Sequence, residues 1–110
     1  MIDALITGRL HSEPERRTAK NGNPYAVAKV RVPTSGGEAL FVSVIAFNEA
    51  PVTALLALGE GDSVAIAGEL TPKVWTDKAG VARPSLDLIA HAVLTEYHVM
   101  RKRKALEAEV

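Results

Sequence analysis

The segment from Ala39 to Phe47 constrains the fold of this chain more than any other, because its residues alternate between two characters. Side chains along a β-strand point alternately to opposite faces. One face of this segment carries small apolar residues: Val42, Val44 and Ala46. The other face carries Phe41, Ser43, Ile45 and Phe47. A uniformly small apolar face suits the interior of a tight barrel, so we expect the two phenylalanines to point outward.

Two outward phenylalanine rings on one strand need something to cover them, because exposed apolar patches mark interaction sites. Nucleic-acid bases would serve, since every base has a π-face that stacks on an aromatic ring. A partner subunit would serve as well. In the alternative interpretation the two faces are reversed, and both rings belong to the core.

Turn signals and alternation divide the chain into five strands and one short helix. We expect strands at residues 4–10, 25–32, 39–47, 64–70 and 85–94, with residues 14–17 as a ragged polar extension of the first. The run Asn21-Gly22-Asn23-Pro24 is a strong turn signal. Asn48 suits the N-cap of a helix, and Gly59 suits its end.

Three strands, a short helix and two more strands predict an all-β chain with the OB-fold. This fold is a five-stranded Greek-key β-barrel, and the helix would lie between strands 3 and 4. An SH3-like barrel or another small β-fold is the alternative, but the position of the helix favours the OB-fold. Gly8 and Gly68 lie inside predicted strands, where glycine marks a sharp bend or a close backbone approach.

Trp75 lies in a polar hairpin, where a buried indole would have little apolar company. Three cations flank it: Lys73, Lys78 and Arg83. Indole offers a large stacking area, and the cations would hold a phosphate backbone beside it. The alternative is an indole folded back on its own strand. Because the Thr71-Pro72 step permits a bulge, alternation alone does not predict which face Trp75 takes.

The charge of the chain is uneven along its length, although 13 basic and 13 acidic residues give a net charge of zero. Residues 9–31 hold six basic residues against two acidic ones, and residues 71–85 hold three against one. Residues 32–70 hold five acidic residues and no basic one. If the basic segments share a face, a neutral chain still presents a positive groove to phosphates. They also fit ordinary solvated strands.

Several classes of function lack support in the sequence. With no cysteine there is no disulfide framework and no thiolate nucleophile. His11, His91 and His98 have no carboxylate at metal-ligand spacing, so we expect each to be satisfied or solvent-facing. No acid–base pair or Gly-rich phosphate loop stands out, so we expect no enzyme, no metal and no cofactor. No stretch spans a bilayer, which predicts a cytoplasmic protein without a membrane partner.

The motifs together resemble bacterial single-stranded DNA-binding proteins, in register from about Leu5 to Thr95. The matching segments are Ile6–Leu10, Pro14–Arg17, Asn21-Gly22, Val27–Thr34, Phe41–Phe47, Leu58–Val64, Gly68–Leu70 and Trp75–Gly80, with Arg83 beyond. The resemblance implies base stacking on Phe41, Phe47 and Trp75. It also implies that five cations lie near the path of the bound DNA strand: Arg17, Lys29, Arg31, Lys73 and Arg83. It further implies a homo-oligomer, a tetramer joined through first-strand edges or a dimer.

The chain departs from this family in its loop and its C-terminus. The loop at residues 34–38 is short, so the tryptophan that longer loops contribute is missing. The Gly/Pro/Gln-rich linker and acidic tail are also missing, which puts recruitment of replication and repair enzymes in doubt. We therefore predict an OB-fold domain at residues 1–96 and a basic C-terminal tail at residues 97–110, with the composition of a short helix. As part of a helix its basic run would be either a phosphate contact or a solvated face.

The resulting prediction is a protein that binds single-stranded DNA with little sequence specificity, in replication, recombination or repair. Short-looped, tailless relatives of this barrel include primosomal replication protein N (PriB), a dimer that acts with replication-restart proteins. A PriB-like role is therefore one alternative. The other is an OB-fold module that binds a protein and no nucleic acid, because one fold hosts many functions.

Overall fold

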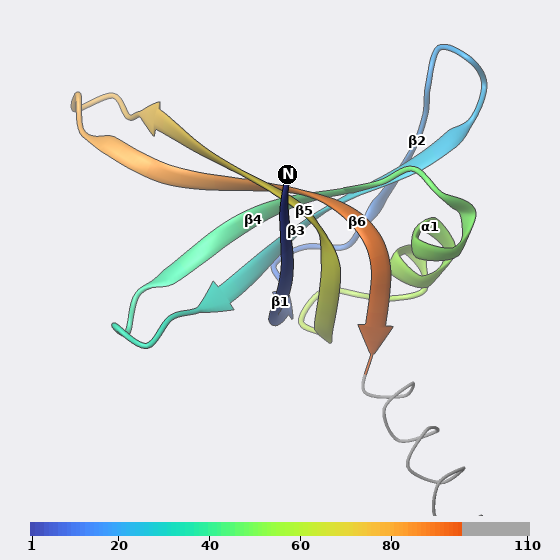
Figure 1. The fold of residues 1–110 in the computed structure, drawn as a ribbon, viewed down its shortest axis with the longest axis horizontal. Helices are drawn as coiled ribbons and strands as arrows, with labels where there is room; N and C mark the ends of the chain where they lie inside the picture. Colours follow the sequence, from blue (N-terminus) through green and yellow to red (C-terminus); the bar gives the residue numbers. More distant parts are fainter. Residues whose placement is uncertain (96–110) are drawn as a thin grey trace, which may run out of the picture.

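The computed structural model describes residues 1–95 as six strands and one short helix (Figure 1). The predicted basic tail at residues 97–110 lies outside the described residues. The elements in chain order are β1 (Ile2–Leu10), β2 (Glu15–Thr18), β3 (Pro24–Pro33), β4 (Ala39–Ala46), α1 (Glu49–Leu56), β5 (Ser63–Thr76) and β6 (Ala82–Thr95). No helix among these residues is long and apolar enough to cross a membrane.

Five of the strands form a closed ring in the order β1-β5-β6-β4-β3, which returns to β1. The ring closes where Arg9 and Leu10 of β1 pair with Arg31 and Val30 of β3. All pairings are antiparallel except that of β4 with β6. This connectivity confirms the predicted Greek-key OB-fold barrel.

The polar segment expected to extend the first strand forms a strand of its own, β2. It pairs with β3 from Glu15 opposite Val27 to Thr18 opposite Pro24, and it adds a sixth strand at the outer edge of β3. The helix therefore lies between β4 and β5, which are still the third and fourth strands of the barrel ring. Asn48 occupies the N-cap position without a side-chain capping bond, and α1 ends at Leu56, three residues before Gly59.

The irregularity in the β5–β6 pair lies at Gly68 and not at Thr71-Pro72. The register shifts between Ala67 and Gly68, and His91 is the extra residue of β6 at this point. Beyond it the pairing runs unbroken past Pro72 to Thr76, opposite Ala82. A bulge bends a strand, and it forms here because the sheet must curve to close the barrel.

Gly8 and Gly68 both lie where another strand approaches too closely for a side chain. A Cβ atom at Gly68 would lie 2.0 Å from the carbonyl oxygen of Ile89, and one at Gly8 would lie 2.3 Å from that of Arg31. Both distances are far below van der Waals contact. The predicted role of these glycines in close backbone approach is confirmed.

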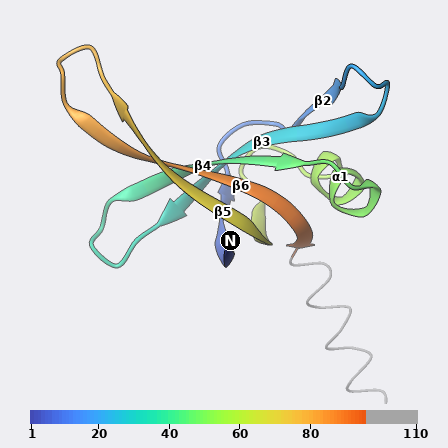
Figure 2. The ribbon, with the colours of Figure 1, turned by 45° about the horizontal axis from the view of Figure 1, so that its top comes forward.

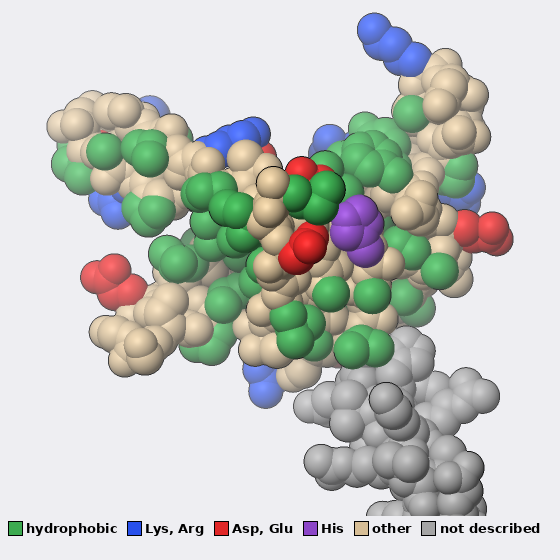
Figure 3. All heavy atoms as spheres, viewed as in Figure 1, with side chains coloured by type: hydrophobic (Ala, Val, Ile, Leu, Met, Phe, Trp, Pro, Cys, Tyr) green, Lys and Arg blue, Asp and Glu red, His purple; other side chains and the backbone are tan. Residues whose placement is uncertain are grey.

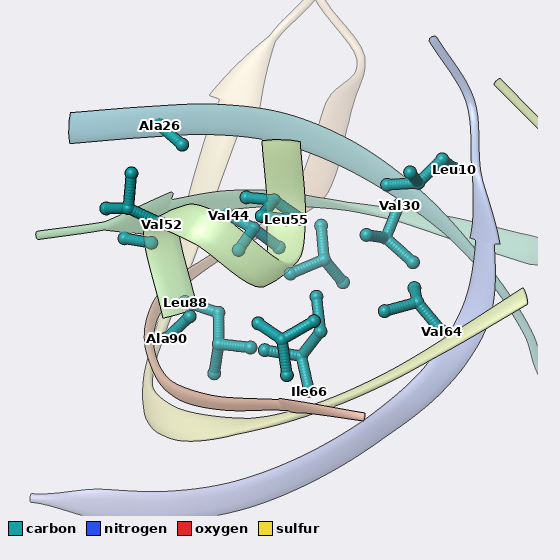
Figure 4. Close-up of a cluster of buried hydrophobic side chains, with 13 residues drawn as sticks. Leu10, Ala26, Val30, Val44, Val52, Leu55, Val64, Ile66, Leu88 and Ala90 are labelled. Atoms are coloured by element: carbon teal, nitrogen blue, oxygen red, sulfur yellow. The ribbon is translucent and has the colours of Figure 1, made fainter. Parts of the chain in front are cut away.

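The core fills the barrel with small and medium apolar side chains from every strand of the ring (Figure 4). Helix α1 contributes Val52 and Leu55, and Leu55 is fully buried. The two long hairpins, β3–β4 and β5–β6, reach out to one side of the barrel, whereas α1 and the β2–β3 hairpin lie on the other (Figure 2). The outer surface between these arms contains the candidate site.

Candidate functional site

Strand β4 has one face in the core and one face at the surface. The inner side chains Val42, Val44 and Ala46 are at most 2% exposed, whereas Phe41 is 43% exposed and Phe47 is 54% exposed. The predicted facing of the two rings is therefore confirmed, and the reversed assignment is wrong. The physical cause is size, because the small inner residues fit a narrow interior that two phenylalanines would overfill.

Trp75 faces the same outer surface as Phe41. The unbroken β5–β6 register places Trp75 opposite Arg83 and Lys73 opposite Ser85. Residues opposite each other in an antiparallel pair project to the same face, so this face of the hairpin carries the indole and both cations. Trp75 is 51% exposed and lines the same hollow as Phe41.

Two adjoining hollows make up this surface. We call the first the Phe47 hollow, of 780 Å³; it also contains Arg17, Lys29, Ser43 and Lys73. The second is the Trp75 hollow, of 610 Å³; it contains His11, Lys29, Phe41, Ser43, Trp75 and Arg83. Lys29 and Ser43, a directly opposed pair on β3 and β4, line both. The hollows therefore form one groove, and each lies within the roughly 300–1,000 Å³ typical of ligand pockets.

Three of the predicted phosphate-binding cations already have a carboxylate partner. Arg17 contacts Glu15 at 3.0 Å, Arg83 contacts Asp77 at 2.8 Å, and Lys73 is paired with Asp87. The hydrogen bond from Arg17 to Glu15, together with the charge of that carboxylate, raises the pKa of Arg17. These cations are more than half exposed, so a phosphate can reach them. Because each is paired, the phosphate would compete with the protein's own carboxylates.

Asp77 is a structural residue of this site that the sequence reasoning missed. Its carboxylate accepts hydrogen bonds from the backbone N–H groups of Ala79 and Val81 and from the Nε of Arg83. These bonds, with that to Arg83 the largest cause, lower the pKa of Asp77. The Asp-x-x-Gly turn ending at Gly80 was the available signal. Asp77 thus holds Arg83 beside the indole.

The remaining predicted cations divide between the groove and its surroundings. Lys29 lies between the two hollows, and Arg31 lies opposite Phe41. Within residues 1–95, no carboxylate forms an ion pair with either side chain. Arg31 and Lys78 line neither hollow. The structure therefore brings together the three aromatic rings with Arg17, Lys29, Lys73 and Arg83, and it leaves Arg31 and Lys78 outside.

Two further rings contact the predicted phenylalanines. The ring centroids of His11 and Phe41 lie 4.9 Å apart with an interplanar angle of 73°, and those of Tyr25 and Phe47 lie 5.9 Å apart at 38°. His11 is exposed, as expected, but it is also a lining residue of the Trp75 hollow. Its position one residue after β1 carried no sequence signal for this contact, which depends on the pairing of β1 with β3.

A second surface lies on the outer face of β1, β5 and β6. Hydrophobic side chains are spread across it, acidic and histidine side chains lie near its centre, and Lys and Arg side chains stand toward its periphery (Figure 3). Leu5 is 64% exposed and Leu94 is 46% exposed. Residues 2–8 of β1 pair with β5 along one edge, and no other described strand pairs with their second edge. This face thus combines exposed apolar side chains with an open strand edge.

Comparison with known proteins links both the sequence and the fold to one group. Residues 1–95 match the Single-strand binding protein family. No curated protein matched the sequence. The structure is similar to a small single-stranded DNA-binding protein from Streptomyces coelicolor, with a TM-score of 0.70 and 23% identity. It is also similar to the mitochondrial single-stranded DNA-binding protein Rim1 from S. cerevisiae, with a TM-score of 0.65 and 20% identity. Each match covers 86% of this chain and 94% of the other.

Proposed function

The chain belongs to the Single-strand binding protein family, and from this premise we propose that it binds single-stranded DNA with little sequence specificity. The observation that carries the proposal is the continuous groove that joins Phe47, Phe41 and Trp75 through Lys29. Exposed rings spaced along a groove that also carries lysine and arginine side chains suit successive bases of a flexible DNA strand. Stacking and phosphate contacts do not read base edges, so sequence preference is expected to be weak.

The role of each side chain follows from its chemistry. Phe41, Phe47 and Trp75 would stack on bases, and Lys29 would contact phosphate at the centre of the groove. Arg17, Lys73 and Arg83 would contact phosphate after leaving or sharing their carboxylate partners. Arg31 and Lys78 would act from the margins of the groove, where a longer DNA strand would pass over them. The biological setting we propose is DNA replication, recombination or repair in the cytoplasm, as a binding protein without catalytic activity.

Titration of the intrinsic fluorescence with oligo-dT tests this proposal, because Trp75 is the only tryptophan of the chain. We expect strong quenching as a base stacks on the indole, and we expect the affinity to fall as salt rises. Absence of salt-sensitive quenching with long oligonucleotides at low ionic strength would overturn the proposal.

One observation favours a protein-interaction module as the second candidate. The Phe47 hollow contains three cations and three carboxylates, the latter being Glu13, Glu15 and Asp87. Such a balanced surface attracts a polyanion less than a net positive one does.

A PriB-like role in replication restart remains an alternative within the DNA-binding class. The short loop between β3 and β4 supports it; this loop is closed by the hydrogen bond from Thr34 N–H to the Glu38 carbonyl at 3.2 Å.

The face of β1, β5 and β6 supports a homo-oligomer, as a tetramer or a dimer. The open edge of β1 offers unpaired backbone groups to a second copy, and the exposed Leu5 and Leu94 would be covered in the assembly. Sedimentation equilibrium of the full chain measures the number of subunits. A dimer would favour the PriB-like alternative, and a monomer at micromolar concentration would contradict the homo-oligomer.

A further inference from the structure

The structure points to a fourth ring in the groove: we propose that His11 and Phe41 form a two-ring corner that receives one nucleotide base. This inference rests on the proposed function and extends it to a residue outside the three expected stacking positions. It assigns a binding role to a histidine that immediately follows β1. The ligand class is a nucleobase of single-stranded DNA.

The position of His11 is held by the backbone of the barrel. Its N–H donates a hydrogen bond to the carbonyl oxygen of Lys29 at 2.8 Å, directly after the pairing of β1 with β3. Phe41 lies on β4, which pairs with β3, and it is directly opposite Arg31 of β3. The imidazole therefore reaches the Phe41 ring from a fixed backbone position, across the strand between them.

The two rings are arranged edge to face and are not stacked on each other. The two ring planes meet at 73°, with their centroids 4.9 Å apart. In the proposed corner, a base stacked flat on Phe41 would be nearly perpendicular to the imidazole and would present an edge to it. Both rings are exposed and both line the Trp75 hollow. A pair that served only to pack the core would be covered by other side chains.

The surroundings of the corner suit a nucleotide. Lys29 of β3 and Arg83 of β6 line the same hollow and would attract the phosphate, and Glu38 is its one acidic lining residue among residues 1–95. Within residues 1–95, no hydrogen bond occupies the imidazole nitrogens. They therefore stay available to donor and acceptor groups on a base edge. Trp75 faces the corner from the opposite hairpin, where it would take the neighbouring base.

Affinity measurements on three variants test the corner. We expect His11→Ala to weaken oligo-dT binding about fivefold, within the range for losing one edge-to-face contact between rings. His11→Phe restores a ring and should bind within about threefold of the wild-type chain. His91→Ala is the matched control: this exposed histidine of β6 lines neither hollow, and its removal should leave the affinity unchanged.

A direct readout comes from the imidazole ¹H–¹³C NMR signals of the full chain during titration with a short oligo-dT. The His11 signals should shift with added DNA, and the His91 signals should not. Wild-type affinity for His11→Ala, or a His11→Phe variant as weak as His11→Ala, would overturn the two-ring corner. If Trp75 quenching still shows that the wild-type chain binds DNA, that failure leaves the proposed function intact. No binding by the wild-type chain would overturn both.

Discussion

The two hollows of the groove differ in how they would hold DNA. The Phe47 hollow has one ring and an equal number of cations and carboxylates. The Trp75 hollow has three rings, those of His11, Phe41 and Trp75, and two cations against one carboxylate. One side of the groove is thus rich in stacking surface and net positive, and the other is sparse in rings and electrically balanced.

If the groove binds DNA as proposed, this difference predicts that the binding energy would be concentrated on the Trp75 side. Each base–ring stack contributes about 1–3 kcal/mol, whereas an exposed ion pair contributes about 0–1 kcal/mol. A phosphate would compete with Glu15 for Arg17 and with Asp87 for Lys73 in the Phe47 hollow. In the Trp75 hollow it would compete with Asp77 for Arg83. Lys29, which lies in both hollows, would link the two sides.

The largest predicted effect comes from removing one ring on each side. Trp75→Ala should weaken oligo-dT binding by about 2–3 kcal/mol, and Phe47→Ala by about 1–2 kcal/mol, because the indole is larger and lies on the net positive side. Anisotropy of a labelled oligonucleotide measures both. Equal losses would break the asymmetry. A free energy of unfolding lowered by about 3–5 kcal/mol in Phe47→Ala would show that this ring acts as a core residue.

The next effect concerns the shared cation. Lys29→Gln should weaken binding by about 1 kcal/mol and reduce the salt slope of log K by about 0.7, the value for one phosphate contact with a single strand. Lys20→Gln is the matched control, because this exposed lysine in the turn between β2 and β3 lines neither hollow. An unchanged salt slope in Lys29→Gln would contradict a central phosphate contact.

Removing a competing carboxylate should have a smaller effect of opposite sign. Asp87→Asn frees Lys73 in the Phe47 hollow and should strengthen binding by about 0.5 kcal/mol, within the range of an exposed ion pair. Glu60→Gln changes the net charge equally in an exposed turn outside the groove and should leave the affinity unchanged. Similar gains in both variants would assign the effect to net charge alone.

The smallest effect is the pH dependence of the hairpin beside Trp75. Because the pKa of Asp77 is lowered in the folded chain, its hydrogen bonds stabilise the turn at pH values above 3.8, the ordinary pKa of this carboxyl group. That contribution is lost as the pH falls through the lowered folded pKa. The amide signals of Ala79 and Val81 should therefore stay unchanged from pH 7 to about pH 4 and shift below it. In Asp77→Asn this acid transition should be absent.

The short-range patterns of the sequence predicted the barrel well. Alternation in β4 correctly separated Val42 and Val44 from Phe41 and Phe47, because burial follows side-chain parity on a strand. Turn residues marked the connections, because the backbone preferences of Gly, Pro and Asn are also local. The prediction that residues 14–17 extend the first strand was wrong, because the structure has a separate strand, β2, at Glu15–Thr18. Its four exposed residues show no alternation, and it becomes a strand only by pairing with β3.

What the sequence by itself determined is the set of rings and cations and the strand faces that carry most of them. Only the tertiary structure decided how they are grouped. The facing of Trp75 depends on the pairing of β5 with β6, which runs through Pro72 without the bulge that Thr71-Pro72 permitted. The contact of His11 with Phe41 and the pairing of Lys73 with Asp87 join residues distant in the chain. Alternation along one strand carries no information about such contacts, because they arise from the way the strands curve and close into a ring.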